Sequence, residues 1–416
     1  MNVNGLHLIE PRSYAERGYP HAEWKQLRRE APVAFFEPPE WQSFWAITKH
    51  ADIIEVSKQP DLFVNGPGMT LIREEMARRQ RESGSFGQMR TIINMDQPDH
   101  RKYRKVASPW FTPRGLKRLD EIVDVSARGL VDSLGREGEC DFITDVASLH
   151  PLKVLAHILG VPAEDEPFIL RLTNELFGAE DPEFQRTGAA DREANMRALG
   201  LEFFTYFNKV TESRRAKPAD DLASVIANAH VDGKPMGVME TMGYSLIVFT
   251  AGHETTRGGI GGGMLALLEN PAEREKWARD PSLAETAIDE LIRYVTPVNH
   301  MVRTATADYE LRGQKIRAGD RLVLFYASAN RDEEVFDAPD ALRLERDPNP
   351  HLAFGIGEHF CIGSHLARKT TNALFRELLP RLEHVELAGT PQRTASNLVP
   401  GIKHLPIRYR LKPAGA

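Results

Sequence analysis

The sequence predicts a mainly α-helical protein with small β-sheets, and three observations support this fold class. From His100 onward, apolar residues recur mostly with the period of an α-helix. Residues 239–269 are predicted to form one helix of roughly thirty residues, about 45 Å long, and so apolar that it must cross the core. Strand-like runs are short and lie at residues 33–36, 44–47, 309–316 and 321–326.

The amino-terminal part is predicted to form a short helix at residues 21–29 followed by a small sheet built on the first two strand-like runs. Residues 59–91 lack a helical period and mix glycines with apolar side chains, so we expect a mobile loop with apolar tips. The polar stretch at residues 178–192 is predicted to be an exposed connection between helices.

Beyond the long helix, Asn270 and Pro271 stop the helical pattern, and shorter helices are predicted at residues 273–279 and 283–294. Residues 330–354 are rich in Pro and Asp and have no period, but they include apolar side chains, so we expect an ordered meander. A last helix is predicted at residues 364–379.

Composition narrows the class of protein further. The 416 residues are 41% hydrophobic and 27% charged, which is enough apolar material for a large buried interior. Neither a linker nor a repeat divides the chain, so we expect one domain over residues 1–416. We also expect the protein to act as a monomer. The first twelve residues resemble neither an export signal nor a membrane anchor, and two distant cysteines suit a reducing cytoplasm. A net charge of -6 argues against a nucleic-acid partner.

The strongest local signal is the segment FGIGEHFCIG at residues 354–363, directly before a predicted helix. Its glycines permit a tight turn and close approach to a flat ligand, and Cys361 lies at a helix amino terminus, which favours the thiolate that binds metals. A lone cysteine is usually a small buried apolar residue, and Cys140 keeps that interpretation. A zinc site would need further closely spaced ligands, which the sequence lacks.

This segment resembles the haem-binding loop of the cytochrome P-450 superfamily. The resemblance implies that Cys361 is the axial thiolate of haem b, that His359 binds a haem propionate, and that Gly363 lies against the cofactor. It also implies the P-450 fold, with the haem between the long central helix and the helix that follows the cysteine.

Polar residues interrupt the long helix at Ala251-Gly252-His253-Glu254-Thr255-Thr256, where a local kink or water-filled gap is plausible. The segment resembles the oxygen-binding motif of the same family, which implies that Glu254 and Thr255 manage protons beside the iron. A zinc-protease helix is excluded because Arg257 stands where that motif needs histidine. The glycine cluster at residues 258–263 lies inside the helix, which excludes a phosphate loop and leaves close helix packing as our interpretation.

Two further groups extend the resemblance. Glu290 and Arg293 match the family's Glu-x-x-Arg motif, and with Arg346 they are expected to form a buried structural network. His100 and Arg104 lie one helical turn apart in a segment that resembles the propionate-binding helix, and Arg303 matches the other propionate position.

The implied activity is a haem-thiolate monooxygenase that uses O2 and receives electrons from a ferredoxin and its reductase. The expected substrate is apolar, of terpenoid, steroid or fatty-acyl type, because the residues placed by position in the pocket are mainly apolar. These pocket residues are Ile247, Ala251, Val298, Asn299, Met301 and Ile402, with Phe86 or Met89 from the predicted loop.

Two other activities remain open at this point, a peroxide-using haem-thiolate hydroxylase or isomerase and a haem-based sensor or carrier. The ferredoxin is expected to dock on a basic face on the cysteine side of the haem. The residues expected there are Lys102, Lys105, Arg114, Arg368, Lys369 and Arg376.

Overall fold

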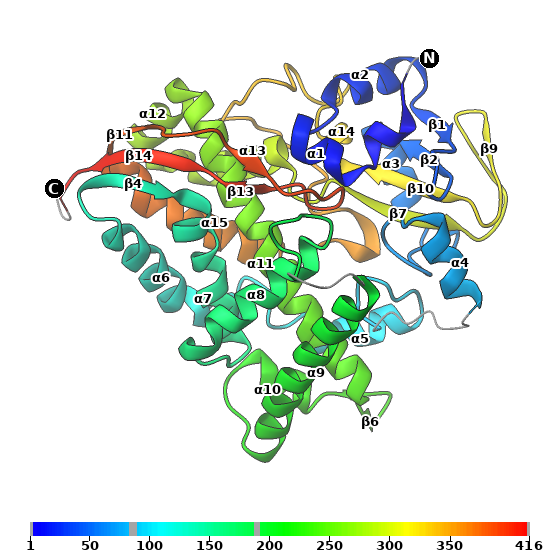
Figure 1. Ribbon diagram of the computed structural model, residues 1–416, viewed down its shortest axis with the longest axis horizontal. Helices are drawn as coiled ribbons and strands as arrows, with labels where there is room; N and C mark the ends of the chain where they lie inside the picture. The colour runs from blue at the N-terminus through cyan, green and yellow to red at the C-terminus, as the bar shows by residue number, and fades with distance from the viewer. Residues whose placement is uncertain (1–2, 83–89, 187–191, 414–416) are drawn as a thin grey trace.

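The structure is a computed structural model that describes residues 3–82, 90–186 and 192–413. Helices form most of the molecule, and strands gather mainly at one end and along one edge (Figure 1). The α-helices are α1 Pro11–Arg17, α2 His21–Glu30, α3 His50–Ser57, α4 Glu74–Glu82, α5 Asp99–Ala107, α6 Asp120–Ser133, α7 Leu149–Ile158, α8 Glu166–Phe177, α9 Arg192–Ala216, α10 Leu222–Ala227, α11 Val238–Glu269, α12 Pro271–Arg279, α13 Ala284–Val295, α14 Tyr326–Ala329 and α15 Ser364–Leu378.

The strands form one larger sheet, with the order β1-β2-β10-β7-β3, and smaller ones, of which β11-β14-β4 has three strands. In the larger sheet only β2 and β10 pair in parallel. The strands are β1 Val33–Phe36, β2 Phe44–Ile47, β3 Phe63–Val64, β4 Glu137–Asp141, β5 His230–Val231, β6 Lys234–Pro235, β7 His300–Ala305, β8 Tyr309–Leu311, β9 Gln314–Ile316, β10 Arg321–Phe325, β11 Leu382–Leu387, β12 Gln392–Arg393, β13 Ile402–His404 and β14 Pro406–Leu411.

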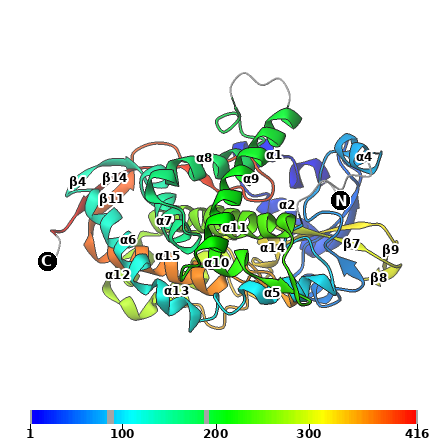
Figure 2. The same cartoon turned by 90° about the horizontal axis from the view of Figure 1, so that it is seen from below.

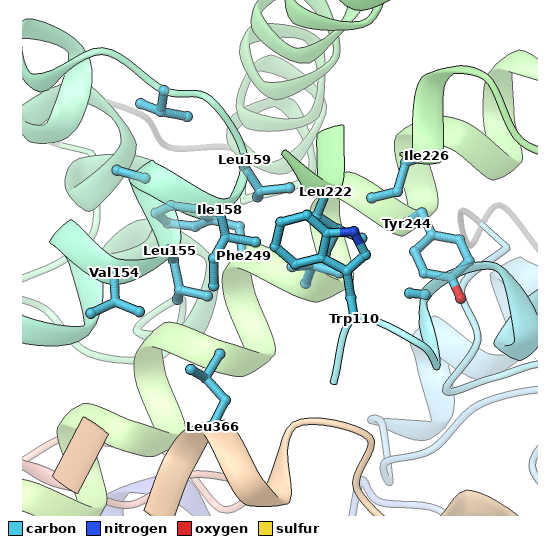
Figure 3. Packing of buried hydrophobic residues seen from close by; sticks show 14 of the residues in the cluster. Trp110, Val154, Leu155, Ile158, Leu159, Leu222, Ile226, Tyr244, Phe249 and Leu366 are labelled. Atoms are coloured by element: carbon cyan, nitrogen blue, oxygen red, sulfur yellow. The ribbon is translucent and has the colours of Figure 1, made fainter. Parts of the chain in front are cut away.

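Helix α11 runs through the centre of the molecule, as the sequence predicts. Figure 2 shows it with α8 and α9 on one side and α15 on the other. Its apolar side chains meet those of its neighbours on several sides, and Figure 3 shows Phe249 of α11 packed with Leu155 of α7 and other buried residues, with Leu366 of α15 facing the same cluster. Burying a leucine or phenylalanine side chain contributes about 1.5–3 kcal/mol, so this cluster fixes the helices that surround the cavity described below.

The glycine cluster of α11 is explained by close packing. A Cβ at position 262 would lie 2.6 Å from Cγ1 of Val295 in α13, and a Cβ at position 261 would lie 2.3 Å from Cδ1 of Ile143. Both distances are shorter than van der Waals contact, so these glycines let α11 approach its neighbours closely.

Two sequence predictions need correction. The segment 59–91 is not one loop, because it contains β3 and the nine-residue helix α4; residues 83–89, with Phe86 and Met89, lie outside the described residues. Strand β7 lies where no strand was predicted. The long helix is assigned without a break through Gly252 and the polar residues that follow it.

Candidate active site

The cysteine loop is held between the meander and the start of α15. Gly355 and Gly357 have φ angles of 68° and 78°, in the left-handed region that favours glycine, and a Cβ at position 357 would lie 2.5 Å from the carbonyl oxygen of Ser57. The amide of Cys361 donates a hydrogen bond to the carbonyl of Phe354 at 2.9 Å, which closes the loop. The loop geometry therefore requires glycine at position 357 and fixes the position of Cys361.

The side chain of Cys361 faces an internal cavity between the loop and α11. Burial raises the pKa of the Cys361 thiol, while the amide of Gly363 and the guanidinium groups of Arg104 and Arg368 act in the opposite direction. Thiolate at this position therefore needs the further positive charge that a bound metal ion supplies. Cys140 lies elsewhere, in β4, and neither cysteine forms a disulfide.

Four basic side chains gather at one side of this cavity. The imidazole rings of His100 and His359 stack with their centroids 3.9 Å apart, and Arg104 and Arg303 line the cavity beside them. Burial lowers the pKa of His359 to about 2, with His100, Arg303 and Arg104 adding to the effect. Burial likewise lowers the pKa of His100, with a further contribution from Arg104.

This basic group lacks acidic partners. Arg303 is 5% exposed and donates to the carbonyl of Val302, yet no carboxylate pairs with it or with Arg104 in the part of the chain that the structure describes. Nε2 of His100 is buried and has no hydrogen-bond partner among the described residues. Buried cations and donors of this kind need an anion, and the two propionates of a haem fit that need.

The polar motif of α11 lies across the cavity from the cysteine loop, but its residues divide between two environments. Thr255 lines the cavity, and its hydroxyl donates to the carbonyl of Ala251 at 2.6 Å. Glu254 is 1% exposed, does not line the cavity, and forms a buried ion pair with Arg257. Burial raises the pKa of Glu254, while Arg257 opposes that rise.

Arg257 is a member of this site that the sequence reasoning missed, although its position three residues after Glu254 on one helix was a signal for the pair. Its guanidinium also donates to Oδ1 of Asn174 in α8, at 3.2 Å. One oxygen of Glu254, Oε2, has no partner. The ion pair with Arg257 therefore holds one carboxylate oxygen of Glu254, and the other oxygen can still accept a hydrogen bond.

Of the residues predicted for the substrate pocket, Ile247, Ala251, Val298 and Met301 line this cavity. Asn299 and Ile402 do not, which corrects their assignment. The amide of Asn299 is buried and donates to the hydroxyl of Tyr14 and the carbonyl of Asn397, while Ile402 packs in a separate hydrophobic cluster. Wall residues that the sequence did not identify are Ile292, Pro297, Leu398 and Val399.

Glu290, Arg293 and Arg346 lie together beneath this region. Glu290 is fully buried and accepts hydrogen bonds from Nε of Arg293 at 2.7 Å and Nε of Arg346 at 3.0 Å. Arg293 also donates to the carbonyls of Asn330 and Pro339. These bonds join α13 to the meander that leads to the cysteine loop.

A cysteine presented to a mainly apolar cavity under a long helix, with a buried basic group beside it, is the arrangement of a haem-thiolate enzyme. No cluster of three or more His, Cys, Asp or Glu side chains could hold a metal ion among the described residues. Over the same residues, no helix has the length and apolarity needed to cross a membrane.

Comparison with known proteins identifies the family. The Cytochrome P450 family model matches residues 281–412. Cytochrome P450-terp of Pseudomonas sp is 39% identical, covering 97% of this chain and 96% of its own, and the steroid C26-monooxygenase of Mycolicibacterium smegmatis is 35% identical, covering 94% and 90%. The crystal structure of CYP108D1 from Novosphingobium aromaticivorans superposes with a TM-score of 0.88 at 38% identity, covering 98% of both chains. The chain belongs to the cytochrome P450 family and is a monooxygenase of that family.

Proposed function

We propose that this monooxygenase inserts one oxygen atom of O2 into an apolar terpenoid, steroid or fatty-acyl substrate, with Cys361 as the ligand of haem b. The observation that carries the proposal is one cavity that the Cys361 side chain and the Thr255 side chain both line. In the balanced reaction, substrate, O2, two electrons and two protons give the hydroxylated product and water. The haem would supply the redox chemistry that activates O2.

The protein's own residues would bind and orient the cofactor. Cys361 would hold the iron, and the basic group of His100, Arg104, Arg303 and His359 would bind the two propionates by charge-assisted hydrogen bonds. Gly363 would leave room for the cofactor, since it also lines the cavity. Glu290 and its two arginines would hold the meander in position without contacting the reacting atoms.

Thr255 and Glu254 would deliver the two protons. The Thr255 hydroxyl lies at the cavity wall, whereas Glu254 lies behind the wall and is bound to Arg257. Glu254 would therefore have to turn away from Arg257 to pass a proton toward the cavity, and its free oxygen gives it an acceptor for that purpose.

The proton-delivery proposal can be tested by coupling measurements. Thr255→Ala should still bind substrate and consume electrons but release peroxide in place of product, and Glu254→Gln should slow turnover and alter the solvent isotope effect. Thr256→Ala is the matched control, because Thr256 lines the same cavity one residue further on. Unchanged coupling and rate in both variants would remove these residues from the mechanism. Efficient product formation from added hydrogen peroxide, without electron donor and O2, would instead favour a peroxide-using enzyme.

We propose a ferredoxin and its reductase as the electron source, with docking on the cysteine side of the cavity, in a monomeric, single-domain enzyme of the cytoplasm. Phe360, next to Cys361, is 41% exposed. Lys105 is also exposed and lies in α5, the helix that carries His100 and Arg104, and Arg114 is exposed shortly after the end of that helix. Within the described residues neither Lys105 nor Arg114 is in an ion pair. The other four predicted cations are paired with acids: Lys102 with Asp232, Arg368 with Asp289, Lys369 with Asp120 and Arg376 with Asp124.

Lys105 is therefore the sharper probe of docking. Lys105→Glu should slow first-electron transfer from the ferredoxin and flatten its salt dependence, because opposed local charges steer the encounter. Lys315→Glu is the control, since Lys315 is exposed on β9, which Figure 2 shows far from α5. Stopped-flow rates of Lys105→Glu that match the control across a salt series would place the docking site elsewhere.

A further inference from the structure

A second cavity, of about 610 Å³, lies next to the one that Cys361 faces. It is bounded by α4, α8, α9, the middle of α11 and the turn at residues 395–398. The two cavities have wall residues in common, namely Met69, Ile93, Phe177, Ile247 and Leu398. The shared walls place the two cavities side by side, and this outer cavity alone has the size of a small-ligand site.

The interior of this outer cavity is mainly apolar, and two of the hydroxyl groups in its wall donate to backbone carbonyls. Thr173 donates to the carbonyl of Ile169 at 3.1 Å, and Thr250 donates to the carbonyl of Leu246 at 2.6 Å. Of the described residues in its wall, only Arg73 and Glu180 carry charge. A substrate inside it is therefore offered apolar contact and few unused hydrogen-bond donors.

Arg73 is the cation in this wall, and two carboxylates surround it. Its guanidinium lies 3.1 Å from Oε2 of Glu40 and 3.6 Å from Oε1 of Glu10, and it stacks over the ring of Trp41 at 4.9 Å. The Trp41 indole also donates to Glu10 at 3.2 Å, which fixes that carboxylate beside Arg73. The local charge of this group of three ionised side chains is negative.

We propose that the outer cavity admits neutral substrates, alcohols or ketones on an apolar skeleton, and rejects carboxylates of the same skeleton. A carboxylate that enters must leave water without gaining a free cation, because the charge of Arg73 is already shared between Glu10 and Glu40. A hydroxyl or ketone loses far less solvation. The inference rests on the proposed function and narrows its substrate class away from free fatty acids.

The experiment compares matched ligands on the holoenzyme. Citronellol against citronellate, and dodecan-1-ol against dodecanoate, are titrated by equilibrium dialysis and by the spin-state change of the haem. For each pair that binds, we expect the alcohol to bind about tenfold more tightly or better, which corresponds to about 1.4 kcal/mol. Equal binding of the carboxylate, or no binding by either pair, would overturn the inference.

Freeing Arg73 should then reverse the preference in part. In the double variant Glu10→Gln with Glu40→Gln, carboxylate binding should tighten by about two- to tenfold while alcohol binding stays constant. The expected gain is small because an exposed ion pair changes the free energy only modestly. Adding Arg73→Gln should abolish the gain. Glu16→Gln, which removes an exposed carboxylate from α1 outside the cavity wall, is the control. A gain that persists without Arg73, or no gain at all, would show that this group does not set the selectivity.

The spectrum of the reduced protein with carbon monoxide distinguishes failure of this inference from failure of the proposed function. A red-shifted Soret band together with lost selectivity would refute only this inference. Absence of that band in the wild type would refute the proposed thiolate ligation itself.

Discussion

Replacing Gly262 by alanine tests how closely α11 packs against α13. The new Cβ would lie 2.6 Å from Cγ1, 3.1 Å from Cγ2 and 3.4 Å from Cβ of Val295. Because valine is stiff at χ1, it cannot rotate its methyl groups away, and overpacking of this kind costs about 1–3 kcal/mol. Alanine also gains about 1 kcal/mol of helix propensity over glycine. The net change in the free energy of unfolding should therefore lie between about zero and a loss of 2 kcal/mol.

Gly258→Ala provides the comparison, since the nearest atom to its new Cβ would be Cβ of Pro297 at 3.7 Å, an ordinary contact. Both variants gain the same helix propensity, so their difference of about 1–3 kcal/mol reports the steric clash alone. Urea unfolding of each holoenzyme, followed by far-ultraviolet circular dichroism, measures that difference. Adding Val295→Ala to Gly262→Ala should recover part of the loss. If Gly262→Ala is as stable as Gly258→Ala, the packing argument is refuted.

Three further predictions concern buried and partly buried charges. Arg257→Gln should destabilise the protein by about 3–5 kcal/mol in urea unfolding because it strands Glu254, and the double neutral variant Glu254→Gln with Arg257→Gln should lose clearly less than the two single variants together. Burial lowers the pKa of His404, but the neighbouring carboxylates of Asp141 and Glu183 outweigh it and hold that pKa above its usual value of 6.5. The stabilisation by His404 is therefore complete below pH 6.5 and is lost as the pH rises through the higher folded-state pKa. The difference in unfolding midpoint between wild type and His404→Gln should shrink as the pH rises above 6.5, and a constant difference would exclude His404. Glu290→Gln should lower the thermal midpoint far more than Glu285→Gln, an exposed position on the same helix, and equal shifts would argue against the buried network.

Much of the fold could be predicted because its elements carry local signals. The strands at residues 33–36 and 44–47 match β1 and β2, and the long helix at residues 239–269 differs from α11 by one residue at its start. Helix α4 was missed because it is almost wholly polar, with Ala77 as its buried residue, and because glycines on both sides suggested a loop. Strand β7 was missed because its burial does not alternate strictly along the chain.

The site was predictable where a short motif fixes position and not where distant segments meet. The cysteine loop and Thr255 both lie at the cavity. Their positions could be predicted because each depends on the local sequence of one loop or one helix. Asn299 was misplaced because its partner Tyr14 is 285 residues away along the chain, and no local pattern announces such a contact. The second cavity is lined by residues from widely separated segments between Pro11 and Leu398, so neither the cavity nor the charge in its wall could be predicted from local sequence.

The sheet β11-β14-β4 sets an order of events during synthesis. Its central strand, β14, is made long after β4, since the contacting residues Asp141 and Leu405 are 264 positions apart. At translation rates of about 5–20 residues per second this delay is on the order of tens of seconds, during which β4 lacks β14, the strand it pairs with in the finished sheet. The sequence of β4, Glu137-Gly-Glu-Cys-Asp141, places an acidic side chain at every second position. Repulsion between such strands opposes pairing with the same strand of another nascent chain, so the acidic pattern protects the waiting edge until β14 arrives.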